Sequence, residues 1–208
     1  MDGGKGDVRA DIPGWAAQEI IAAGQRMDRL GLVPATAGNL SLRLPGTESA
    51  VITRSGGHKG FLTPDHLMVV GFDGTPLSPG KPSAETLLHC QLYRLFPQVG
   101  AVLHGHSVAG TVLSMAGQEI VFTDYEVVKA FAGQTTHATT VPLPVFDNDQ
   151  DISRLAKRIE QQLRHDTVGY FLRGHGAYVW GADMTRALVH LEALEFLLAC
   201  ELERRKLR

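Results

Sequence analysis

Short apolar segments, grouped between longer amphipathic ones, constrain the fold of this chain more than any other feature of its sequence. Their length and their β-branched and aromatic residues predict β-strands. The segments are LSLRL (40–44), AVIT (50–53), HLMVVGFDG (66–74), GAVLHGH (100–106), EIVFT (119–123), TTVPLPVF (139–146), VGYFL (168–172) and AYVW (177–180). Because they do not alternate one by one with helices, the pattern favours an α/β layered domain with a mixed or largely antiparallel sheet.

Apolar residues at helical spacing predict the helices between these strands. One helix is expected over residues 12–30, and another is expected to begin near Ser83, a favourable N-cap, and to end near residue 95. Shorter helical stretches are expected over 107–116 and 124–131. Further capping residues are Asp149 or Asp151 for an amphipathic helix and Asp183 for a long C-terminal one. The two prolines of TTVPLPVF predict an irregular or edge strand.

Composition argues against several classes of partner. The 208 residues carry a formal net charge of −2 and 44% hydrophobic residues. This balance offers no basic excess for nucleic acid and no long apolar run for a membrane, so we expect neither partner. The two cysteines are expected to be reduced, and no signal-peptide pattern is present, which together favour the cytoplasm. We expect residues 1–10 to be disordered and residues 11–208 to form one domain.

Two histidines, His104 and His106, lie one residue apart at the end of the segment GAVLHGH. In an extended strand, residues i and i+2 point to the same face, so the two imidazoles are presented together. A third histidine, His175, lies in the glycine-bracketed turn RGHG between two predicted strands. Three neutral histidines are a usual ligand set for a catalytic zinc ion with one open position. Alone, the HGH pair is equally typical of ordinary strand-end histidines, and His175 alone is more typical of a turn residue than of a ligand.

Three loops have the composition of an anion site. TAGNLS (36–41), TRSGGHKG (53–60) and KPSAET (81–86) each combine hydroxyl or amide side chains with glycine or a helix start. Backbone N–H groups and hydroxyls in such loops bind phosphate, although most loops of this composition are only turns. None of the three matches a Walker or Rossmann pattern, so a nucleotide is not indicated.

Two carboxylates are candidates for general acid or base. Glu85 follows the KPSA loop, where a glutamate is also common at a helix start. Glu126, in FTDYEVVKA, is equally compatible with an ordinary helix residue. Either side chain could transfer a proton if it reached a metal-bound substrate, and spacing alone does not choose between them.

The ordered set GNLS, ITRSGG, KPSAE, HGH and RGHG resembles the class II aldolase/adducin family, over about residues 13–203. The resemblance implies a single α/β/α domain with a central, mainly antiparallel sheet. It also implies a homotetramer with its sites at subunit interfaces. The segments KPSAET, FTDYEVVKA, VPLPVFDNDQDI and RGHGAYVWG are most similar to a dehydratase branch of methionine salvage. That branch acts on a ketose phosphate with a methylthio tail.

The same resemblance implies roles for individual residues. His104, His106 and His175 match the ligands of a divalent metal, usually Zn²⁺ and one per subunit. The residues that match the phosphate site of the aldolases are Asn39, Ser55, Gly56 and Ser83. Glu85 matches the acid/base of the bacterial aldolases, and Glu126 matches the glutamate that dehydratases use as proton donor and acceptor. Arg54 replaces a proline that is common in the aldolases.

Three alternatives to a dehydratase remain open at this stage. A sugar-phosphate aldolase and a ribulose-phosphate 4-epimerase both use the same kind of metal site, so the ligands do not discriminate between them. The Glu126 motif favours the dehydratase. A non-catalytic interaction module, as in the adducin head domain, is disfavoured because all three histidines are present.

Overall fold

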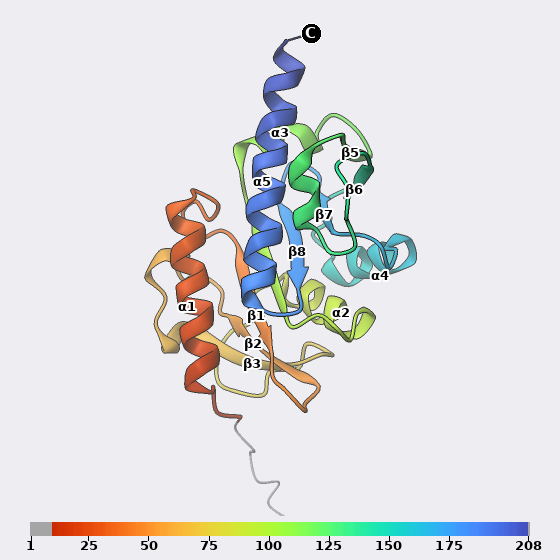
Figure 1. Cartoon of the computed structure of the whole chain (residues 1–208). Coiled ribbons are helices and arrows are strands. Elements are labelled where there is room, and N and C mark those ends of the chain that lie inside the picture. The colour runs from red at the N-terminus through yellow and green to blue at the C-terminus, as the bar shows by residue number, and fades with distance from the viewer. Residues whose placement is uncertain (1–9, 208) are drawn as a thin grey trace, which may run out of the picture.

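The computed structural model describes residues 10–207, which contain one eight-stranded sheet in the order β3-β2-β1-β4-β8-β7-β6-β5 (Figure 1). All neighbouring strands are antiparallel except β6 and β7. This confirms the mainly antiparallel sheet. The strands are β1 (Asn39–Arg43), β2 (Ser49–Thr53), β3 (Leu67–Gly71), β4 (Ala101–Gly105), β5 (Glu119–Thr123), β6 (Thr140–Phe146), β7 (Gly169–Leu172) and β8 (Ala177–Gly181).

Helices cover both faces of the sheet, which makes the architecture α/β/α. They are α1 (Gly14–Arg29), α2 (Thr86–Leu95), α3 (Val108–Ser114), α4 (Ile152–Gln162) and α5 (Met184–Lys206), with 3-10 turns η1 (Lys59–Phe61), η2 (Pro64–His66) and η3 (Glu126–Ala130). Residues of α1, α3 and α5 pack in one apolar core, and those of α2 and α4 pack in another on the opposite face (Figure 1). Five strands are buried throughout, as expected for a sheet covered on both faces.

The register of the central strands determines where the predicted site residues lie. Asn39 on β1 pairs with His104 on β4, and His104 pairs in turn with Tyr178 on β8. Residues directly opposite each other in neighbouring strands point to the same face of a sheet. The end of β4 therefore presents His104 between one side chain from each neighbouring strand.

Several helix boundaries follow the predicted caps. The carboxylate of Asp151 accepts the N–H of Arg154 at 3.0 Å, and that of Asp183 accepts the N–H of Arg186 at 2.7 Å. Asp149 pairs instead with the guanidinium of Arg154, at 2.6 Å. Side-chain caps therefore begin α4 and α5 as their sequences indicate.

Three sequence-based expectations were wrong in detail. The helix expected near Ser83 begins at Thr86. The residues before it form a turn instead, because Pro82 forms an isolated β-bridge with Arg54, the residue that follows β2. The helix expected over 124–131 is the 3-10 turn η3. β6 is not an edge strand, since it lies between β5 and β7. Its two prolines are tolerated because β6 pairs with β7 only from Val145 onward.

The cysteines, the helices and the N-terminal segment bear on the expected surroundings of the chain. Cys90 and Cys200 are both free thiols, of which Cys90 is in the core and Cys200 is half-buried. Within residues 10–207, no helix has both the length and the apolar character needed to cross a membrane. Residues 1–9 of the segment expected to be disordered lie outside the described residues. Ala10 donates its N–H to the carbonyl of Leu77 at 3.0 Å.

Candidate metal centre

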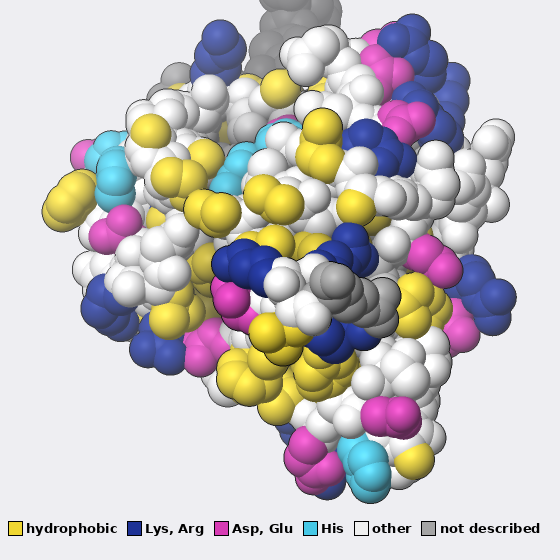
Figure 2. Space-filling model, turned by 90° about the horizontal axis from the view of Figure 1, so that it is seen from above, with side chains coloured by type: hydrophobic (Ala, Val, Ile, Leu, Met, Phe, Trp, Pro, Cys, Tyr) yellow, Lys and Arg dark blue, Asp and Glu magenta, His cyan; other side chains and the backbone are white. Residues whose placement is uncertain are grey.

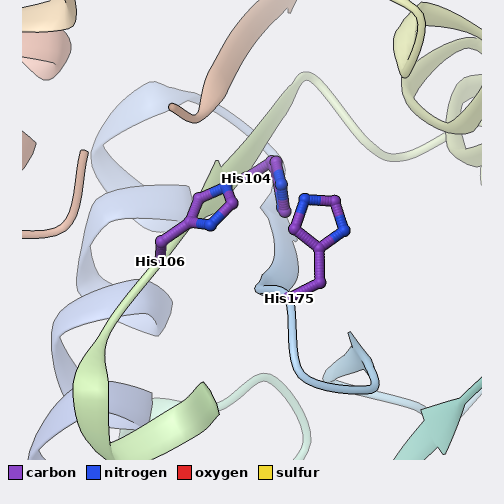
Figure 3. A group of neighbouring side chains, drawn as sticks. All are labelled: His104, His106 and His175. Atoms are coloured by element: carbon purple, nitrogen blue, oxygen red, sulfur yellow. The ribbon is translucent and has the colours of Figure 1, made fainter. Parts of the chain in front are cut away.

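His104, His106 and His175 lie together at the end of β4 (Figure 3). Their ring centroids are 4.6 Å apart for His104 and His106, 5.0 Å for His104 and His175, and 4.9 Å for His106 and His175. One nitrogen from each ring lies within 4.8 Å of the others. Three imidazole nitrogens this close together can all bind one divalent cation.

The orientation of His104 is fixed by its neighbours on β8. Its Nδ1 donates to the carbonyl oxygen of Ala177 at 2.9 Å, and the ring of Tyr178 stacks on it with centroids 4.1 Å apart. This leaves Nε2 fully buried and without a hydrogen bond among the described residues. A buried polar atom without a partner is costly, and a backbone bond at the other ring nitrogen is typical of metal-binding histidines. The arrangement therefore fits a metal ligand.

The turn that carries His175 requires its glycines. Gly174 has a φ of +62°, which side chains with a Cβ rarely adopt. A Cβ on Gly176 would lie 2.7 Å from Cε1 of His104 and 2.5 Å from the carbonyl oxygen of Gly105. Thr111 on α3 donates its hydroxyl to the carbonyl oxygen of His175 at 3.2 Å. The glycine-bracketed turn thus approaches β4 closely and is attached to α3.

Glu85 is the carboxylate that the structure places beside the histidines. Its Oε1 lies 3.1 Å from Nε2 of His175, and its Oε2 lies 3.4 Å from Nε2 of His104. Asn39 donates its side-chain N–H to Oε2 at 2.8 Å. Sequence reasoning did not foresee this Asn39–Glu85 contact, because it depends on where the turn before α2 meets β1.

Burial and neighbouring charges act against each other on the pKa values of Glu85, His104 and His106, and the net shift of each pKa is downward. Burial alone would raise the pKa of Glu85, but the His175 hydrogen bond and the neighbouring imidazoles lower it to about 2. Burial lowers the pKa of His104 to about 3 and that of His106 to about 4. At neutral pH the imidazoles of His104 and His106 are therefore neutral and Glu85 is a carboxylate, the protonation states that metal binding requires.

A polar cavity of about 360 Å³ opens in front of the histidines. All four residues that match the family's phosphate site line it, namely Asn39, Ser55, Gly56 and Ser83. Two cations that were not assigned a phosphate-binding role also line it, Arg54 and Lys59. The fully buried Lys59 donates its Nζ to the carbonyls of Thr36 and Gly57 at 2.7 and 2.6 Å. Burial lowers the pKa of Lys59, although the charge of Glu85 raises it. The sequence signal that could have identified Lys59 as a cavity residue is its position in the glycine-rich loop TRSGGHKG.

Glu126 lies elsewhere, on η3. Its side chain is 67% exposed and pairs with Lys129, and one of its oxygens lies 3.7 Å from Nδ1 of His137. It is not among the described residues that line the cavities next to His106 and His175. Within one chain, the structure therefore brings Glu85 to the histidines and leaves Glu126 outside the cluster.

The fold and this site define a class of protein, and comparison with known families agrees. The model of the class II aldolase and adducin N-terminal domain matches residues 18–202. The chain belongs to this family. A solved relative is the L-fuculose-1-phosphate aldolase from Thermus thermophilus, which is 27% identical. The match covers 92% of this chain and 94% of that one, with a TM-score of 0.74.

More particularly, the chain is similar to proteins named methylthioribulose-1-phosphate dehydratase. The protein of that name from Gluconacetobacter diazotrophicus is 63% identical, over 96% of this chain and 98% of its own length. The one from Pseudomonas savastanoi pv. phaseolicola is 54% identical, over 90% of this chain and 94% of its own. The similarity thus extends over nearly the whole of each protein.

Proposed function

We propose that this chain is a methylthioribulose-1-phosphate dehydratase, a lyase of methionine salvage. The reaction removes water from 5-methylthioribulose 1-phosphate and gives 5-methylthio-2,3-dioxopentyl phosphate. The observation that carries the proposal is the near full-length similarity to dehydratases of that name, at 52–63% identity among the relatives compared. The histidine cluster beside a polar cavity supports it, because the proposed substrate carries a phosphate and a polarisable ketone.

A divalent metal, most simply Zn²⁺, completes the proposed site, held by His104, His106 and His175, one ion per subunit. The buried Nε2 of His104, which has no hydrogen bond among the described residues, and the neutral state of His104 and His106 fit such an ion. When bound, the metal supplies a Lewis acid that polarises the substrate's C2 carbonyl and makes the C3 proton acidic.

The polar cavity is proposed to hold the substrate's phosphate. Ser55, Gly56 and Ser83 line it with hydroxyl and backbone groups, and Lys59 and Arg54 add positive charge. Asn39 also lines the cavity, and its amide is bonded to Glu85. The phosphate end of the substrate would then be held while its middle carbons lie near the histidines.

Glu126 is proposed as the group that takes the C3 proton and returns a proton to the departing C4 hydroxyl. The C3–H and C4–O bonds break, water leaves, and the resulting enol ketonises to the 2,3-diketone. Glu85 is the second candidate, and its contacts with His175 and Asn39 favour a role in organising the site. Glu126 requires delivery from a neighbouring subunit, consistent with the homotetramer that the family resemblance implies.

The proposal also covers the domain, the compartment, the partners and the assembly of the protein. Residues 11–208 would form the catalytic domain, the enzyme would work in the cytoplasm, and its partner would be a small sugar phosphate. Nucleic acid and membranes are not expected as partners. Light scattering on the protein as it elutes from a size-exclusion column would test the tetramer directly. The expected molar mass is four times that of the chain.

The first experiment is incubation of zinc-loaded protein with 5-methylthioribulose 1-phosphate, followed by mass spectrometry. The expected product is lighter by one water and does not form after chelation. Cleavage to a three-carbon phosphate would identify an aldolase, and an isomer of unchanged mass would identify an epimerase. No conversion by the metal-loaded protein would contradict the proposed activity.

A further inference from the structure

A second cavity, of about 470 Å³, lies on the other side of the histidine cluster. It shares His106 and His175 with the polar cavity, so the histidines separate two binding volumes. Figure 2 looks down on the end of the molecule where α3 lies, and hydrophobic side chains border histidine side chains there. The two cavities differ in chemistry.

The second cavity is mainly apolar on its α3 side. Val108 and Val112, one helical turn apart, line it together with Pro34, and none of the described residues that line it is Asp, Glu, Lys or Arg. Val108 is 78% exposed and Val112 is 51% exposed, so neither valine is part of the core. The polar cavity, by contrast, contains Lys59 and Arg54.

The wall formed by α3 is held in a fixed relation to the histidines. Ser107, which directly follows His106, caps α3 by accepting the N–H of Gly110 at 3.1 Å. Thr111, between the two valines, donates to the carbonyl oxygen of His175 at 3.2 Å. The apolar wall is therefore attached to two of the proposed ligands, as a specificity pocket requires.

We propose that this cavity binds the apolar thioether end of the substrate, with Val108 and Val112 as its specificity-determining residues. The inference rests on the proposed function. The substrate carries a phosphate at one end, a methylthio group at the other and its reacting carbons between them. The molecule offers the same order: a cationic polar cavity, the histidines and an apolar cavity. A second copy of the chain covering α3 is the competing occupant.

The test compares two substrates that differ only in the tail. One is 5-methylthioribulose 1-phosphate, and the other is 5-deoxyribulose 1-phosphate, which keeps the reacting carbons and carries hydrogen in place of the methylthio group. For each metal-loaded protein, the ratio of the two kcat/KM values measures recognition of the tail. Removal of apolar contacts from such a pocket changes discrimination by about 10- to 200-fold.

The variant is Val108→Ser combined with Val112→Ser, and the control is Val189→Ser, an exposed valine on α5. The double variant is expected to lower the ratio by about 10-fold, mainly through KM for the methylthio substrate, because tail contacts are the same before and during the reaction. The control keeps the wild-type ratio. Light scattering on each protein reports whether the assembly has changed.

Each other outcome overturns the inference. An unchanged ratio in the double variant would show that the valines do not contact the tail. Equal losses for both substrates, with a smaller assembly mass, would show that a second copy covers α3. Failure of the wild-type protein to dehydrate the methylthio substrate would instead remove the proposed function, and this inference with it.

Discussion

At the scale of single residues, His104 carries the strongest mark of a metal ligand, a buried Nε2 without a hydrogen bond. We expect His104→Ala to lose bound zinc, because two remaining imidazoles do not hold the ion as three do. Elemental analysis after dialysis against limiting zinc measures the loss. His165→Ala, at an exposed histidine, should keep one zinc per chain. Full occupancy in His104→Ala would exclude this residue as a ligand.

Sequence alone could predict which residues of the site share a face, but not which residues touch. The HGH spacing places His104 and His106 together through the two-residue period of a strand. The contact between Asn39 and Glu85 follows from the pairing of β1 with β4 and from the turn before α2. Such long-range placement has no local signal. The position of Lys59 in the lining of the polar cavity likewise depends on contacts far apart in the sequence.

At the scale of elements, α3 depends on a glycine that lets it lie directly on β7. A Cβ on Gly110 would lie 2.4 Å from Cζ of Phe171, whose ring is fully buried. Gly110→Ala should therefore lower the free energy of unfolding by about 1–2 kcal/mol, because overpacking outweighs the improved helix propensity. Urea denaturation of the variant and the wild type measures this difference in the free energy of unfolding.

The matched control for that change is Gly117→Ala. Its Cβ would meet nothing closer than 3.6 Å, so stability should be unchanged or raised by up to about 1 kcal/mol. Equal stability of the Gly110→Ala variant and the wild type would contradict the close packing of α3 on β7.

On α5, Glu195 is a half-buried residue whose Oε1 is buried and has no hydrogen bond among the described residues. Burial raises its pKa from 4.5 to about 7, although a hydrogen bond from Ser107 opposes the shift. Because the folded state holds this proton more tightly than the unfolded state, its contribution to stability is present below pH 4.5 and is lost as pH rises through 7. Glu195→Gln removes that loss.

Urea denaturation of the metal-free proteins between pH 5 and pH 8 tests the role of Glu195. Relative to Glu195→Gln, the wild type should lose stability on the order of 3 kcal/mol across this range. Glu203→Gln, at an exposed glutamate of the same helix, should follow the wild-type curve. Parallel curves for wild type and Glu195→Gln would show that the carboxyl is not buried in its neutral form.

Elements with strong local signals were predicted well, and those set by tertiary contacts were not. The caps Asp151 and Asp183 begin their helices as expected, since capping is a contact within four residues. The prolines of strand β6 predicted an irregular or edge strand, yet β6 lies between two strands. One of its neighbours, β7, pairs with only its last two residues, an arrangement that no local pattern specifies.

At the scale of the whole molecule, one chain holds the three histidines and the polar cavity, whereas Glu126 lies outside them. In the proposed tetramer, each site combines the histidines of one subunit with Glu126 of a neighbour. His104→Ala and Glu126→Gln should therefore each be inactive alone, and the latter should keep its metal. Retained activity in Glu126→Gln, with Glu85→Gln inactive, would assign the proton transfer to Glu85 instead.

Mixed tetramers of the two inactive variants test the shared site directly. If subunits mix at random, roughly a quarter of the sites pair intact histidines with an intact Glu126 from the neighbour, and turnover should recover to about that fraction. Two differently tagged chains, co-expressed and purified through both tags, supply the mixture, and native mass spectrometry verifies it. Inactive mixed tetramers of verified composition would show that Glu126 acts within its own chain or does not act at all.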